Sequence, residues 1–93
     1  MDIAKSNIVK STAGRDAGKF FFVLETQGDF LLLADGKTRR VETPKRKRQK
    51  HVTLVGESHS LVAEKIRSGE KITNSELRKA IAAISGGNQD QEG

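Results

Sequence analysis

Short apolar runs separated by turn residues occupy the sequence from Ile8 to Val55, and their close spacing constrains the fold more than any other feature. Runs of this length, rich in aromatic and β-branched residues and bounded by glycine, aspartate or proline, are typical of β-strands. Five strands within so short a stretch predict a small antiparallel barrel, closed or nearly closed, because closure leaves no sheet edge exposed. The predicted strands lie at Ile8–Val9, Lys19–Leu24, Phe30–Ala34, Thr38–Glu42 and His51–Val55.

The fourth strand of this prediction depends on the turn before it and the proline after it. Asp35-Gly36 has the composition of a two-residue hairpin turn, which requires positive φ angles. Pro44 lacks a backbone N–H and would end the returning strand. The basic residues that follow Pro44 are then expected to form a loop before the last strand.

The periodicity changes after Gly56, where two short helices are predicted. Ser58 or Ser60 can cap the first helix, and Gly69 can end it. The second begins at Thr73-Asn74-Ser75-Glu76, which has capping-box spacing, and its apolar face consists of Leu77, Ala80, Ile81 and Ile84. Gly86-Gly87 should end this helix. Because such short helices are unstable alone in water, we expect them to dock on the barrel, on each other or on a partner.

Positive charge is concentrated in the segment 37–51 (KTRRVETPKRKRQKH). It holds eight of the 17 Lys and Arg residues but only one of the 12 Asp and Glu residues, and so carries a net charge of +7. Since the whole chain carries +5, the other residues together carry −2. A basic segment on a nearly neutral body is typical of a protein that binds a polyanion.

Other interpretations of the basic segment compete with nucleic-acid binding. A charged run often forms only a solvated face, and PKRKRQK also resembles a nuclear-import signal or a patch for anionic lipids. However, the charges interrupt a folded unit between two strands, where their mutual repulsion is costly. This position favours contact with nucleic acid or the ribosome.

No pattern in the chain indicates an enzyme or a cofactor. Gly14 and Gly18 are separated by three residues, where a nucleotide-binding P-loop needs four, and Phe20 stands where that loop needs Ser or Thr. His51 and His59 lack neighbouring ligands or an orienting acid, so we expect neither a metal site nor a catalytic base. The absence of cysteine excludes disulfides and thiol chemistry and suits a reducing compartment.

The stretch from about residue 8 to residue 55 contains an ordered series of short elements: Ile8-Val9, Gly14-Arg15-Asp16, Gly18-Lys19, Gly28-Asp29, Ala34-Asp35-Gly36-Lys37, Arg39-Arg40-Val41 and Pro44-Lys45. With these elements in this order, the stretch resembles the KOW-motif domain of nucleic-acid-binding proteins. It is most similar to a short bacterial group of KOW-domain RNA-binding proteins, which is itself similar to a eukaryotic and archaeal large-subunit ribosomal protein family. The resemblance implies an SH3-like barrel that binds RNA, frequently ribosomal RNA, without catalysis.

The sequence therefore predicts a cytoplasmic RNA-binding protein with no membrane-spanning segment. Its organisation should be a barrel at 1–56, two docked helices at 57–87 and a disordered tail at 88–93. The alternative is an adaptor whose barrel or C-terminal helices dock on a protein partner. Ten cations are predicted to contact RNA, from the basic segment and from the loop between the first two strands: Arg15, Lys19, Lys37, Arg39, Arg40, Lys45, Arg46, Lys47, Arg48 and Lys50.

Overall fold

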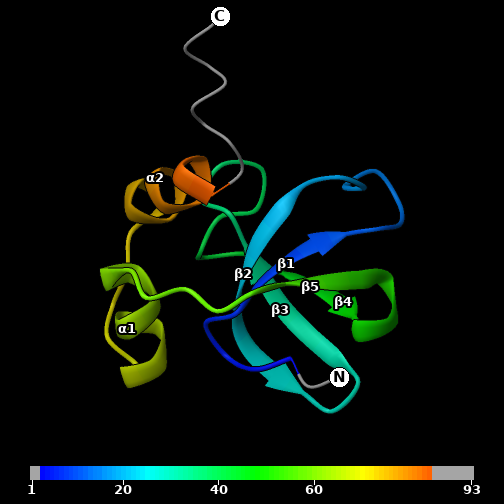
Figure 1. Cartoon of the computed structure of the whole chain (residues 1–93), viewed down its shortest axis with the longest axis horizontal. Coiled ribbons are helices and arrows are strands. Elements are labelled where there is room, and N and C mark those ends of the chain that lie inside the picture. Colours follow the sequence, from blue (N-terminus) through cyan, green and yellow to red (C-terminus); the bar gives the residue numbers. More distant parts are fainter. Residues whose placement is uncertain (1–2, 85–93) are drawn as a thin grey trace, which may run out of the picture.

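The fold is a five-stranded antiparallel sheet followed by two helices (Figure 1). The structure is a computed structural model, and it describes residues 3–84. The predicted class, mostly β with C-terminal helices, is confirmed. No helix among these residues is long and apolar enough to cross a membrane. The elements are β1 (Ile8–Ser11), β2 (Phe20–Gln27), β3 (Phe30–Ala34), β4 (Lys45–Arg48), the 3-10 turn η1 (Gln49–His51), β5 (Val52–Gly56), α1 (Leu61–Ser68) and α2 (Asn74–Ile84).

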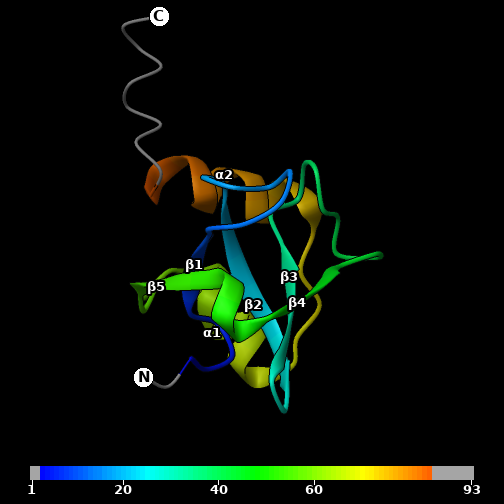
Figure 2. The ribbon, with the colours of Figure 1, turned by 90° about the vertical axis from the view of Figure 1, so that its right-hand side faces the viewer.

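The strands are ordered β4-β3-β2-β1-β5, so the two outer strands are β4 and β5. They follow each other in the sequence and are joined by η1 (Figure 2). Every ladder between neighbouring strands is antiparallel. The described residues form no ladder between β4 and β5, so closure of the sheet into a barrel stays a prediction.

The prediction of a strand at Thr38–Glu42 is wrong, because this segment is a loop and the basic run after Pro44 forms β4 instead. Leu33 pairs with Lys45, and Leu31 pairs with Lys47. The cause lies in Asp35, whose carboxylate accepts hydrogen bonds from the backbone N–H groups of Lys37 and Arg39 and from the hydroxyl group of Thr38. These bonds fold the chain into a compact turn, where a two-residue hairpin would have continued directly into a strand.

Contacts with α2 fix the position of this loop. The backbone N–H of Val41 donates to the Asn74 side chain at 2.8 Å, and the Arg78 guanidinium donates to the carbonyl of Gly36 at 3.1 Å. Gly36 has a φ of 79°, and a Cβ at this position would collide with the carbonyl of Asn74. The loop is thus fitted to a helix that lies more than thirty residues later in the chain.

The sheet carries an apolar cluster on each face, because successive residues of a strand point in opposite directions. Phe22 of β2 points toward the helices, whereas Phe21 and Val23 point toward the opposite face. The cluster on the helix side consists of Ile8, Phe22, Ala34, Val62, Ala63, Ile66 and Leu77. The cluster on the other side consists of Val9, Phe21, Val23, Leu31 and Leu33.

Both helices begin where local capping predicts. Ser60 caps α1 by accepting a hydrogen bond from the N–H of Ala63, and Gly69 ends it in the left-handed conformation. In α2 the capping box is reciprocal: Thr73 Oγ1 accepts from the N–H of Glu76 at 3.1 Å, and Glu76 Oε1 accepts from the N–H of Thr73 at 2.9 Å. The helices dock on the sheet, as one of the expected alternatives proposed. The predicted helix end at Gly86-Gly87 and the predicted disordered tail at 88–93 lie outside the described residues.

Candidate nucleic-acid interface

The sequence KRKR of β4 divides its four cations between the two faces of the sheet. In the register with β3, Arg46 lies opposite Leu32, and Arg48 lies opposite Phe30. Lys45 and Lys47 alternate with these arginines and so point to the other face. Both arginines are exposed, whereas Lys47 is only 8% exposed. The strand thus presents arginine outward and lysine inward.

The inward lysines hold the loop 12–19 against β4. Lys47 Nζ donates a hydrogen bond to the carbonyl of Ala13 at 2.8 Å and lies 4.0 Å from Asp16 Oδ2. Lys45 Nζ lies 3.5 Å from the same carboxylate oxygen. Lys47 therefore has a structural role, and we remove it from the predicted RNA-contacting surface because its ammonium group is buried.

The outward arginines stack on the ring of Phe30, which was not among the residues predicted from the sequence to form the site. The guanidinium carbon of Arg46 lies 3.6 Å from the centroid of the Phe30 ring, and that of Arg48 lies 4.7 Å from it. Stacking fixes the planes of the guanidinium groups and leaves their N–H edges free to bind. Neither arginine forms an ion pair with an acidic residue among the described part of the chain.

The loop between β1 and β2 links the two predicted basic regions. Its buried Asp16 contacts β4, and its Arg15 is exposed immediately beside that anchor. At the end of the loop, Lys19 lines a shallow pocket of about 260 Å³ together with Lys37. The structure thus brings Arg15 close to β4 and Lys19 close to Lys37.

The remaining predicted contacts differ in their availability. Lys50 is exposed in η1, directly after β4. Arg39 is half-buried in the turn that Asp35 organises. Arg40 is exposed, but its side chain lies 3.7 Å from Glu42. The exposed cations nearest to β4 with no ion pair among the described residues are Arg15, Arg46, Arg48 and Lys50.

A pocket of about 350 Å³ adjoins this arginine face at η1. Ile3, Val52 and Leu54 form its apolar part, and Arg48 and Lys50 line it as well. The backbone of η1 is fixed to the turn before β3, since the N–H of Gln49 donates to the carbonyl of Asp29 at 2.8 Å. We call this cavity the η1 pocket.

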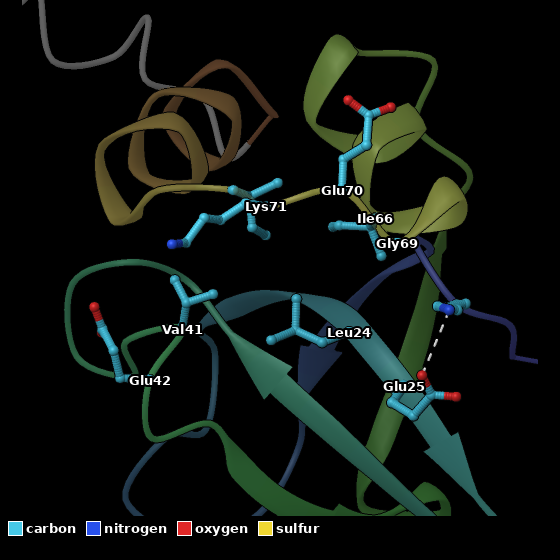
Figure 3. Close-up of a pocket in the computed structure, with 10 residues that line it drawn as sticks. Leu24, Glu25, Val41, Glu42, Ile66, Gly69, Glu70 and Lys71 are labelled. Carbon is cyan, nitrogen blue, oxygen red and sulfur yellow. Dashed lines mark ion pairs between the residues drawn. The ribbon is translucent and has the colours of Figure 1, made fainter.

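A larger groove of about 410 Å³ lies between the sheet and the connection from α1 to α2 (Figure 3). Its apolar residues include Leu24, Val41 and Ile66, and its charged residues are three glutamates and two lysines. Lys5 Nζ pairs with Glu25 at 3.5 Å, as the dashed line in Figure 3 marks. A hydrogen bond from the Asn74 amide lowers the pKa of Glu42, and the positive charge of Arg40 lowers it further. The glutamates make the groove a poor site for a polyanion.

No protein-family model matches this sequence, and no curated protein matches it either. The resemblance to KOW domains therefore stays a prediction from the quoted residues. The case for a function rests on the geometry of the arginine face.

Proposed function

We propose that this protein is a non-enzymatic, cytoplasmic RNA-binding protein whose target is structured ribosomal RNA, free or within the ribosome. The observation that carries the proposal is the arginine face of β4, where Arg46 and Arg48 flank Phe30 and are exposed. The resemblance to KOW domains supports the same conclusion. In this proposal the fold serves to present a fixed basic surface and performs no chemistry.

Binding would depend mainly on phosphate contacts and on the shape of the RNA. An arginine can hold a phosphate with two hydrogen bonds, and its release of counterions makes the affinity depend on salt. Two guanidinium groups lie over the Phe30 ring, so the ring orients the arginines. We therefore expect weak preference for sequence in paired RNA, whose base edges side chains reach poorly.

The adaptor alternative is supported by one specific observation, the groove of Figure 3. Its apolar floor and mixed charges suit a peptide with apolar and basic side chains. The helices themselves offer little further surface, because Val62, Ile66 and Leu77 are already buried against the sheet. Among the large apolar residues of 3–84, only Val55 and Leu61 are exposed. RNA binding by β4 and protein binding by the groove would use different residues.

The test compares two double charge reversals with the same change in net charge. Arg46→Glu/Arg48→Glu should abolish binding to a ribosomal RNA hairpin. Lys71→Glu/Lys79→Glu should weaken it only slightly, because neither lysine belongs to β4 or lines the η1 pocket. In the wild type, three to four phosphate contacts should give a slope of log affinity against log salt of about −2 to −4. Cosedimentation with ribosomal subunits across the same salt series extends the measurement to the assembled target.

Circular dichroism checks that each variant is folded. Equal loss of binding in both double variants would mean that net charge alone drives association, and would contradict the arginine face as the site. Unchanged affinity of the Arg46→Glu/Arg48→Glu variant would reject the proposal outright.

A further inference from the structure

The η1 pocket combines an apolar lining with a cationic rim, and among the pockets of the described residues it is the one that shares a residue with the arginine face. Ile3, Val52 and Leu54 are half-buried and pack against the cluster on the side of the sheet opposite the helices, so they form a fixed floor of the pocket. Arg48 belongs both to this pocket and to the stack on Phe30. The pocket is therefore continuous with the arginine face, and a ligand on that face can reach it.

An unpaired nucleotide has the chemistry that such a pocket needs. Its base is a flat, weakly polar group that can leave the solvent against aliphatic side chains, while its phosphate remains at the charged rim. Arg48 and Lys50 would bind the phosphates on either side of the base. The groove of Figure 3 lacks this arrangement, because three glutamates line it and would repel phosphates.

Asp29 gives the pocket a means of selecting among bases. Asp29 is exposed and lines the pocket, and its side chain makes no hydrogen bond or ion pair with another described residue. Its carbonyl is bound by Gln49, which fixes the position of the residue. A carboxylate repels phosphate but accepts hydrogen bonds from the exocyclic amino groups of cytosine, adenine and guanine, whereas uracil has no such group.

We propose that the η1 pocket binds an unpaired nucleobase that bears an exocyclic amino group, with Asp29 as the acceptor and with Arg48 and Lys50 on the flanking phosphates. This inference rests on the proposed function, since the base enters from RNA that already lies on β4. It adds a site that reads an irregularity in the RNA, namely a bulge or a loop nucleotide, to a surface that otherwise reads only backbone and shape.

The experiment uses three RNA hairpins that differ at one position: fully paired, with a single bulged cytosine, and with a single bulged uracil. The wild type should bind the cytosine bulge roughly tenfold to a hundredfold more tightly than the uracil bulge, the effect of one hydrogen bond to a charged acceptor. In Asp29→Ala this ratio should fall to about one. Glu57→Ala, which removes an equally exposed acid outside the pocket, should keep the wild-type ratio.

A second measurement reports on the pocket without the rest of the RNA. Cytidine monophosphate should shift the methyl NMR signals of Ile3, Val52 and Leu54 and leave those of Val62 and Ile66 on the helix side unchanged. Equal affinity for all three hairpins, with binding still lost in Arg46→Glu/Arg48→Glu, would overturn the pocket and leave the proposed function intact. Failure of the wild type to bind any hairpin would overturn both. Methyl shifts on addition of an apolar peptide but not of the nucleotide would assign the pocket to a protein partner and overturn the inference.

Discussion

Replacing Asp16 by alanine should destabilise the fold, although Asp16 lies in a loop. Its carboxylate is only 8% exposed and lies between the ammonium groups of Lys45 and Lys47. In Asp16→Ala the buried Lys47 ammonium would keep one hydrogen bond, to the carbonyl of Ala13, and lose its counter-charge. Removing one partner of a buried ion pair costs about 3 to 5 kcal/mol.

The geometry places the expected loss below that range. The distance from Lys47 to Asp16 is at the limit for an ion pair, and the side chain of Lys45 is 32% exposed, so water screens its share. We therefore expect a loss of about 2 to 3 kcal/mol in the free energy of unfolding. The double variant Asp16→Ala/Lys47→Met removes both charges of the buried pair and should lie within about 1 kcal/mol of the wild type.

Urea unfolding followed by far-UV circular dichroism measures these differences, since the chain has no tryptophan or tyrosine to report by fluorescence. With an m-value of about 1 kcal/mol per molar urea, the midpoint of Asp16→Ala should fall by about 2 to 3 M. Equal midpoints for the wild type and Asp16→Ala would refute the assigned role of the carboxylate. A double variant less stable than Asp16→Ala alone would show that Asp16 and Lys47 do not act as a pair.

Two further predictions concern the helix side of the sheet. Phe22→Ala should lower the free energy of unfolding by about 3 to 5 kcal/mol, because Phe22 is fully buried beneath both helices. The control Leu61→Ala should change it by less than about 0.5 kcal/mol, because Leu61 is 68% exposed. The hydrogen bond from Lys65 lowers the pKa of Glu76, so the stabilisation by this carboxylate is present above its ordinary value of 4.5 and is lost as the pH falls through the lowered value. Urea midpoints should therefore fall more steeply below pH 4.5 in the wild type than in Glu76→Gln, which keeps the helix cap but loses the charge. Parallel plots of the urea midpoint against pH for the two proteins would contradict this prediction.

The elements that the sequence predicted correctly depend on neighbouring residues. The caps at Ser60, Gly69 and Thr73 act over one turn of helix, so their spacing is visible in the sequence. The third strand, Phe30–Ala34, is likewise bounded by its own turn residues and has the predicted limits. These signals are local, and the structure confirms them.

The fourth strand was misplaced because its position is decided by distant residues. The loop before it is held by Asn74 and Arg78, which belong to α2 and cannot be located by inspecting the sequence around Asp35. Recognising the strand would have required pairing a run of four cations with the apolar strand β3, against the ordinary preference for apolar strand residues. For the same reason the sequence did not indicate that arginines stack on Phe30, because this contact follows from the pairing of Phe30 with Arg48.

The alternation of lysine and arginine in β4 matches the different physical demands on its two faces. On the inner face, a flexible aliphatic stem and a small ammonium group let Lys47 cross the apolar interior and reach both Ala13 and Asp16. On the outer face, the planar guanidinium of Arg46 stacks on Phe30. The smaller ammonium group of a lysine would contact less of the ring. Because the side-chain period of a strand is two, a slip of one residue would bury the arginines and expose the lysines. The loop anchor at Asp16 therefore also fixes the face on which the arginines are presented.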